Sequence, residues 1–267
     1  MGKFKVAIAQ VDCILDDKKA NMNKASNLIK KASKNDVEII IFPEVFLSGY
    51  ALHERLPKLA ERFNDKSEAE ISLLAKENKI MIIMGFLEIN TQDKVFNSLL
   101  LMNKSGNLGE CYRKTHLWPN ELNYFEPGKE LTVIPTEIGT LGLMISYDLY
   151  FPEVARALSL KGAKILFVSA ADWMPHESYV RAFVRSRALE NQAFLVYSNR
   201  VGKQENMNLN FFGESCIVDP KGNVITKAGR GEELMFGEID LSTVEKVRAE
   251  VDFFKDRQPK LYTGQRL

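Results

Sequence analysis

Two short apolar runs near the N-terminus are separated by one amphipathic segment. Lys5 to Val11 is an apolar run, and Val37 to Phe42 is a β-branched run that stops at Pro43. Between them, from about Lys18 to Ala32, apolar residues recur at helical spacing with lysines on the opposite side. The order strand, helix, strand is the βαβ signature, which predicts parallel pairing of the first two strands and an α/β fold.

The alternation of helical and strand patterns continues along the chain. We expect helices over residues 68–77, 151–161, 179–191 and 242–251, and strands over residues 80–87, 96–102, 131–135, 142–146, 165–169, 193–199, 215–218, 224–227 and 234–239. Turn residues within 104–109 and 220–223 predict hairpins, so the sheets are expected to be mixed. Since no repeat or linker interrupts the pattern, we predict one domain over residues 1–267.

The overall charge and the cysteine pattern exclude several classes of protein. The chain carries 36 Lys and Arg against 35 Asp and Glu, which gives no electrostatic reason to bind nucleic acid or an anionic membrane. The three cysteines contain no CxxC pair, so no disulfide framework is expected. No apolar run approaches the roughly 20 residues that span a bilayer, and the N-terminus lacks a signal-peptide pattern. We therefore predict a cytoplasmic protein.

Glu44 directly follows the apolar run that ends at Phe42. Ligands of open α/β sheets collect at strand ends, and the apolar neighbours of this carboxylate would desolvate it. Desolvation raises the pKa of a carboxyl group and suits it to general-base catalysis. Capping of the next turn is the alternative role for Glu44.

Lys114 follows a short strand, among aromatic and polar residues in the run Cys111 to Trp118. A fixed ammonium there would stabilise a developing oxyanion, although an isolated lysine is more often a solvated surface residue. His116 lies in the same run, but a lone histidine is more often structural, and we assign it no role. Glu121 follows in a loop, where an acidic residue is usually solvated.

Ser146 ends a third strand, and the turn after it leads into a helix that begins near Pro152. A strand, a sharp turn and a helix in this order present one side chain at the bend. They also aim the next backbone N–H, that of Tyr147, at the same point. Nucleophilic catalysis needs such an elbow, with an oxyanion donor beside the attacking atom.

Taken in order, these three segments resemble the three signatures of the nitrilase superfamily, which uses a Glu–Lys–Cys triad. Glu44 in FPEVFLSGY matches the glutamate motif, Lys114 in YRKTHLW matches the lysine motif, and Ser146 in ISYDLYFPE stands at the cysteine position. Glu121 matches a second glutamate that many members carry. The likeness covers nearly the whole chain, from the opening KVAIAQ run to the RQPKLY tail. It implies a four-layer αββα sandwich with two mixed β-sheets.

The resemblance implies a role for each of these residues. Glu44 takes a proton from the nucleophile and later from water, while Lys114 and the backbone N–H of Tyr147 hold the oxyanion. Glu121 orients the substrate nitrogen or Lys114, and an acyl-enzyme forms on the residue at position 146. The resemblance implies neither a metal nor an organic cofactor.

The residues around the nucleophile indicate which branch of the superfamily the chain resembles. Nitrilases tend to follow the cysteine with Trp-Glu, whereas Tyr147-Asp148 is similar to amide- and carbamoyl-cleaving members. We therefore expect hydrolysis of a small linear amide or N-carbamoyl compound, with a nitrile hydrolase or an acyltransferase as alternatives. We also expect Tyr50 and Trp173 to bind the substrate, and plain packing is an equal alternative for Trp173.

Serine at the nucleophile position departs from the family pattern. A thiol has a pKa of about 8.5 that a neighbouring cation or base can lower, whereas a hydroxyl is far harder to ionise. Three explanations are open: an engineered Cys-to-Ser change, a natural ligand-binding pseudoenzyme, and a genuine serine enzyme. We favour the first because the rest of the site is intact, and we expect the chain with Ser146 to be nearly inactive.

The C-terminal tail is polar and weakly patterned after Phe254. Relatives in the family often form dimers whose C-terminal tails cross over. The resemblance therefore implies a homodimer, or a higher homo-oligomer, with residues 253–267 at the interface. A frayed terminus is the alternative.

Overall fold

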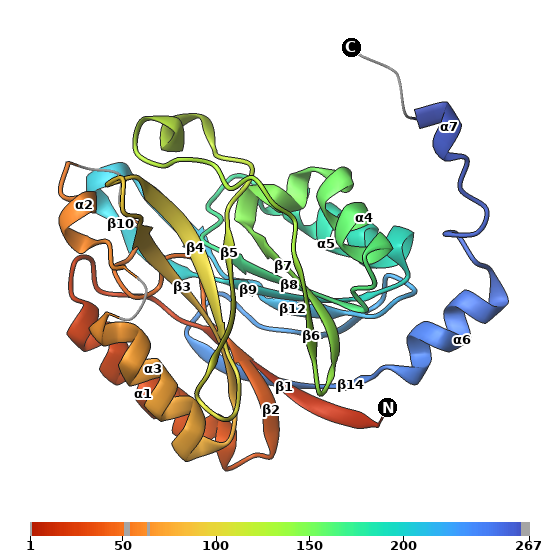
Figure 1. The fold of residues 1–267 in the computed structure, drawn as a ribbon, viewed down its shortest axis with the longest axis horizontal. Helices are drawn as coiled ribbons and strands as arrows, with labels where there is room; N and C mark the ends of the chain where they lie inside the picture. Colours follow the sequence, from red (N-terminus) through yellow and green to blue (C-terminus); the bar gives the residue numbers. More distant parts are fainter. Residues whose placement is uncertain (1, 51–53, 63–64, 263–267) are drawn as a thin grey trace.

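The computed structural model describes residues 2–50, 54–62 and 65–262. Within these ranges, two six-stranded sheets lie face to face, and helices cover the outer face of each sheet (Figure 1). The layers are helix, sheet, sheet and helix. The expectation of a four-layer αββα sandwich with two mixed sheets is confirmed.

The first sheet has the strand order β14-β1-β2-β3-β4-β5. Strands β1, β2 and β3 are parallel, because helices α1 and α3 form the crossovers between them, and the other pairs are antiparallel. The elements are β1 (Lys3–Gln10), α1 (Lys18–Ser33), β2 (Val37–Ile41), α3 (Lys66–Asn78), β3 (Met81–Ile89), β4 (Val95–Met102), β5 (Leu108–Arg113) and β14 (Glu233–Asp240).

The second sheet has the order β13-β12-β9-β8-β7-β6 and the same plan, with three parallel strands in the middle. Helices α4 and α5 cover its outer face. The elements are β6 (Val133–Thr136), β7 (Gly139–Ile145), α4 (Pro152–Leu160), β8 (Ile165–Ala170), α5 (Glu177–Asn191), β9 (Phe194–Asn199), β12 (Cys216–Val218) and β13 (Val224–Lys227).

Helix α1 shows why the sequence folds locally as expected. The side chain of Asp17 accepts a hydrogen bond from the backbone N–H of Ala20 and caps the helix. Met22, Ala25 and Ile29 repeat at helical spacing and are buried against the first sheet, while the lysines lie on the solvent side.

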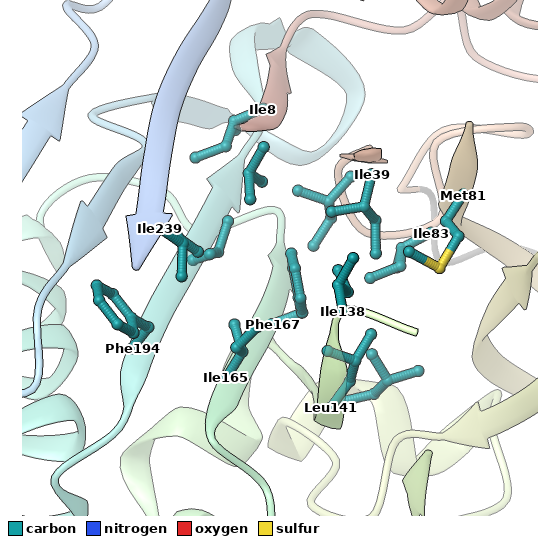
Figure 2. Close-up of a cluster of buried hydrophobic side chains, with 14 of the residues drawn as sticks. Ile8, Ile39, Met81, Ile83, Ile138, Leu141, Ile165, Phe167, Phe194 and Ile239 are labelled. Atoms are coloured by element: carbon teal, nitrogen blue, oxygen red, sulfur yellow. The ribbon is translucent and has the colours of Figure 1, made fainter. Parts of the chain in front are cut away.

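The main hydrophobic core lies between the two sheets (Figure 2). Side chains from β1, β2 and β3 meet side chains from β7, β8 and β9, and all of these strands are nearly continuous apolar runs. Strands buried on both faces require such runs. The core therefore fixes the two sheets relative to each other and with them the strand ends that carry the polar residues.

A few elements were not expected from the sequence. They are helices α2 (Leu56–Leu59) and α7 (Pro259–Tyr262), the short 3-10 helices η1 (Pro119–Asn123), η2 (Ser146–Tyr150) and η3 (Glu205–Met207), and the hairpin of β10 (Val201–Gln204) and β11 (Leu209–Phe212). These elements are too short, and too polar, to produce a hydrophobic period. None of the described helices combines the length and the apolar character needed to cross a membrane.

Candidate active site

Polar residues from both sheets meet around one small cavity. Glu44 follows β2, Lys114 follows β5 and Ser146 follows β7. The cavity has a volume of about 10 Å³, which is room for about one water molecule. The residues that line it are Glu44, Tyr50, Lys114, Trp118, Ser146, Tyr147, Tyr150, Asp172, Trp173 and His176.

Glu44 is held rigidly in the turn after β2. Its Oε1 accepts a hydrogen bond of 2.7 Å from Asn97 Nδ2, and its Oε2 accepts one of 2.9 Å from the backbone N–H of Ala171. The next residue, Val45, has φ of 48°, a strained value for a β-branched residue. The turn packs so closely on β3 that a Cβ at Gly85 would lie 2.5 Å from Val45 N. The position of Glu44 therefore depends on a glycine in another strand.

Lys114 lies between two carboxylates. Its Nζ is 2.7 Å from Glu44 Oε1 and 2.9 Å from Glu121 Oε1, and all three side chains are buried. The backbone is fixed on both sides, since Lys114 N–H donates to Asn97 O at 2.9 Å and Lys114 O accepts from Gly128 N–H at 2.8 Å. Each carboxylate is thus paired with the ammonium, as buried charges require.

The electrostatics of this group favour a base at Glu44. Burial raises the pKa of Glu44 to about 7, although the neighbouring Lys114 opposes the rise. Burial alone would lower the pKa of Lys114, but Glu121 and Glu44 outweigh this effect and raise it, so the ammonium stays charged. A carboxylate with a pKa near 7 next to a permanent cation has the properties of a general base at neutral pH.

Glu121, which the sequence placed in a loop, is fully buried in η1. Its Oε2 accepts from the backbone N–H of Trp118 at 2.7 Å, and its Oε1 accepts from the Tyr50 hydroxyl at 3.0 Å. Tyr50 therefore lines the cavity and also holds Glu121. The alternative of a solvated Glu121 does not fit this burial.

Ser146 lies at the bend between β7 and η2. Its φ of 39° is in the left-handed region, and such strain in a non-glycine residue is common at functional sites. The Tyr147 N–H belongs to the first turn of η2, where backbone N–H groups have no acceptor within the helix. The elbow that the sequence predicted is therefore present, and Ser146 and Tyr147 both line the cavity.

The hydroxyl of Ser146 donates a hydrogen bond of 2.6 Å to Asp172 Oδ1. Asp172 follows β8 and is buried, and burial raises the pKa of its carboxyl group. Asp172 was not expected as a site residue from the sequence, although its neighbour Trp173 was. The signal was present, because Asp172 is a polar residue just after an apolar strand, as Glu44 and Ser146 are.

Asp148 connects the elbow to the lysine segment. Its Oδ2 accepts from Ile145 N–H at 3.0 Å and from the Tyr112 hydroxyl at 2.8 Å. Its Oδ1 accepts from the Thr115 hydroxyl at 2.8 Å and from His116 N–H at 2.9 Å. This carboxylate fixes the end of β7 relative to β5. It was missed as a site residue because most of its contacts come from β5 and the segment after it, which belong to the other sheet.

An aromatic wall closes the outer side of the cavity. Trp173 packs edge-on against Trp118, with ring centroids 5.4 Å apart, and lies 6.2 Å from the Tyr50 ring. Trp173 thus lines the cavity and packs on its neighbours at the same time. His116 stacks on Phe151 at 4.0 Å and is not among the lining residues, in line with the structural role that a lone histidine usually has.

The three cysteines lie away from the cavity. Cys13, Cys111 and Cys216 are free, and none of them lines the cavity. Burial raises the pKa of Cys13 to about 11 and that of Cys216 to about 12, so neither thiol ionises at neutral pH. Within the described ranges no group of three or more His, Cys, Asp and Glu is arranged to hold a metal ion.

Comparison with known proteins finds relatives over nearly the whole chain. Residues 5–249 match the carbon–nitrogen hydrolase family. An (R)-stereoselective amidase of a Pseudomonas species is 33% identical over 255 residues, which are 96% of this chain and 92% of the amidase. The crystal structure of Saccharomyces cerevisiae Nit3, a member of branch 10 of the nitrilase superfamily, is 30% identical with a TM-score of 0.89, over 96% of this chain and 97% of Nit3. A carbon–nitrogen hydrolase from Helicobacter pylori G27 has a TM-score of 0.92 at 27% identity, over 97% of each chain.

The fold and these matches define the class of protein, a member of the nitrilase superfamily built as an αββα sandwich. The chain belongs to the carbon–nitrogen hydrolase family of that superfamily.

Proposed function

We propose that the site hydrolyses the C–N bond of a small linear amide or N-carbamoyl compound and releases ammonia or an amine. The observation that carries this proposal is the position of Lys114, bonded to both Glu44 and Glu121 beside the elbow at Ser146. The amidase among the relatives supports the choice of an amide. Nitrile hydrolysis is the second candidate.

The proposed reaction has two steps, formation of an acyl-enzyme and its hydrolysis. With the family's cysteine at position 146, Glu44 takes the proton of the nucleophile as it attacks the acyl carbon and passes this proton to the leaving nitrogen. Lys114 and the Tyr147 N–H stabilise the oxyanion. The C–N bond breaks, and an acyl-enzyme remains, which with serine is an ester. Glu44 is the general base that activates water for its hydrolysis, and Glu121 orients Lys114.

Serine at this position makes turnover slower than a cysteine would. The hydroxyl of Ser146 is a weaker acid than a thiol and needs a base during the attack. An engineered Cys-to-Ser exchange, a ligand-binding pseudoenzyme and a serine enzyme remain the three explanations. In the first two cases the fold and the cavity are intact, but the chain does not hydrolyse amides efficiently.

The charge of the cavity favours neutral or cationic substrates. Two carboxylates line it, those of Glu44 and Asp172, and the carboxylate of Glu121 binds Lys114 beside it. Lys114 is the only lysine or arginine among the lining residues that the structure describes, and two carboxylates already pair with it. A substrate carboxylate would therefore meet net negative charge without a free cation.

The test of this function is ammonia release from linear amides, N-carbamoyl amino acids and nitriles, comparing the unaltered chain with Ser146→Cys. We expect the Ser146→Cys form to hydrolyse at least one amide or carbamoyl compound, and the unaltered chain to be much slower. Glu44→Gln in the same background serves as the inactive control. If the Ser146→Cys form releases ammonia from none of these compounds, the proposed function is wrong.

Four further properties belong to the same proposal. We propose a homodimer, or a higher homo-oligomer, with the C-terminal tail at the interface; residues 263–267 of that tail lie outside the described residues. We also propose that the chain forms one domain, because the core in Figure 2 joins strands from both halves of the sequence. A cytoplasmic location and a substrate-binding role for Tyr50 and Trp173 stay predictions.

A further inference from the structure

The hydroxyl of Ser146 is bonded to a carboxylate that does not belong to the Glu–Lys–Cys pattern. The distance of 2.6 Å between Ser146 Oγ and Asp172 Oδ1 is typical of a charge-assisted O–H to carboxylate bond. Both side chains are at least nine-tenths buried, at 5% and 4% exposure. Glu44, in contrast, has its two oxygens bonded to Lys114, Asn97 and the backbone of Ala171.

Asp172 is held in place from the adjacent strand β9. Its Oδ2 accepts a hydrogen bond of 2.7 Å from the Tyr197 hydroxyl, and its backbone N–H donates to Asn199 Oδ1 at 2.8 Å. Asn199 in turn donates to Gly213 O at 2.9 Å. One carboxylate oxygen is thus fixed by Tyr197, and the other faces Ser146. Such preorganisation is what a base needs in order to act on a single neighbouring group.

A carboxylate in this position offers a hydroxyl nucleophile an acceptor for its proton, and it makes a thiol at the same position harder to ionise. A nearby negative charge raises the pKa of a thiol and so lowers the fraction of thiolate at neutral pH. A hydroxyl attacks without prior ionisation and needs an acceptor for its proton during the step. The pair formed by Ser146 and Asp172 therefore has the arrangement of a nucleophile and its base.

Building on the proposed function, we propose that Asp172 is a further catalytic residue, the base that receives the proton of Ser146 during attack. Ser146 Oγ forms a bond to the acyl carbon, the carbonyl π electrons move to its oxygen, and the Oγ proton moves to Asp172. The C–N bond then breaks with its electron pair on nitrogen, which takes the proton from Asp172. Glu44 acts in the hydrolysis of the acyl-enzyme, in which it takes a proton from water and returns it to Oγ as the ester bond breaks.

The test separates acylation from hydrolysis of the acyl-enzyme by using p-nitrophenyl acetate. Release of p-nitrophenol in the first turnover, together with the mass of the proteolytic peptide that contains Ser146, measures acetylation of Ser146. We expect Asp172→Asn to lower the acylation rate by about 10²- to 10⁴-fold, the usual range for loss of a general base. Glu44→Gln is still acetylated, and its acetyl-enzyme accumulates. Asp93→Asn, an exposed site with a left-handed backbone that suits asparagine, is the matched control.

A second measurement separates a chemical role of Asp172 from a structural one. In the Ser146→Cys background, Asp172→Asn removes the negative charge beside the thiol. The rate of alkylation by iodoacetamide at pH 7 then rises, by about tenfold for each unit by which the pKa of the thiol falls. Asp172→Asn is thus expected to lower the rate of acylation of Ser146 and to raise the rate of alkylation of the cysteine. Damage to the fold would not change the two rates in opposite directions.

The proposal is overturned if the unaltered chain is not acetylated on Ser146, or if Asp172→Asn is acetylated as fast as the unaltered chain. It is also overturned if Asp172→Asn slows both the serine and the cysteine reactions. Each of these results leaves ammonia release by the Ser146→Cys form as a separate test of the proposed function. The two failures can therefore be distinguished.

Discussion

Lys114 and Glu44 form a buried ion pair, with 2.7 Å between Nζ and Oε1 and at most 2% exposure of either side chain. The two residues are 70 positions apart in the sequence and come from the ends of β5 and β2. Because Glu121 binds the same ammonium, removal of the lysine leaves two buried carboxylates facing each other without a counter-charge.

The first prediction concerns the stability that this lysine provides. Lys114→Met is expected to lower the free energy of unfolding at pH 7 by about 3–5 kcal/mol, the usual cost of breaking a buried ion pair. Urea denaturation followed by circular dichroism measures the loss. Lys66→Met, at a lysine side chain that is 87% exposed, is the control and should change stability by less than about 0.5 kcal/mol. Equal stability of Lys114→Met and Lys66→Met would contradict a charged Lys114 paired with the carboxylates of Glu44 and Glu121.

The second prediction concerns the pH dependence of acyl-enzyme hydrolysis. Glu44, whose pKa burial raises to about 7, accepts a proton from water only when it is ionised. The rate of hydrolysis of the acetyl-enzyme is therefore expected to rise with pH through about 7 and to be about tenfold below its plateau at pH 6. Stopped-flow measurements between pH 5 and 9 test this. If the rate of hydrolysis in Glu44→Gln rises with pH in the same way, the titrating group is not Glu44.

The third prediction concerns Gly85, whose hydrogen faces the turn that carries Glu44. In Gly85→Ala, the new Cβ would lie 2.5 Å from Pro43 O and Val45 N, so the turn has to move. We expect a loss of about 1–3 kcal/mol in stability and, because the base is displaced, of about 10²-fold in kcat/KM. Gly229→Ala meets no atom within 4 Å and is the control. Full activity of Gly85→Ala would show that the position of Glu44 does not depend on this contact.

The fourth prediction concerns the charge of the substrate. Succinamide has an amide group where succinamate has a carboxylate, and the two compounds have nearly the same size. The Ser146→Cys form is expected to hydrolyse succinamide with a kcat/KM at least about tenfold higher, because like charges at close range cost several kcal/mol. The comparison at low and high salt shows whether the difference is electrostatic. A preference for succinamate would mean that a cation outside the described cavity binds the carboxylate.

The fifth prediction concerns oligomerisation through the C-terminal tail. The segment around α7 extends away from the sandwich (Figure 1), and its Leu261 and Tyr262 side chains are 68% and 56% exposed. Apolar side chains exposed together on a tail favour contact with a second chain. Light scattering after gel filtration is expected to give a dimer or larger for the full chain and a smaller mass after removal of residues 251–267. Leu73→Ser, at an exposed leucine on α3, should leave the mass unchanged.

The sequence by itself determined the order of the longer strands and helices and the positions of Glu44, Lys114 and Ser146. Hydrophobic period is a local property, so each strand and its end can be read without knowing the neighbours. The same holds for the elbow, because a strand followed by Pro152 at the start of a helix specifies a sharp turn.

Only the tertiary structure decided which of these polar residues touch. Asp172 is 26 residues from Ser146 in the chain, and the two meet because β7 and β8 are parallel neighbours whose carboxyl ends share one edge. Asn97 reaches Glu44 for a similar reason, through the pairing of β3 with β4. Strand pairing and the packing of two sheets are non-local, and burial depends on them. The burial that raises the pKa of Glu44, and the bond that directs the Ser146 hydroxyl to Asp172, therefore follow from the fold and not from any short stretch of sequence.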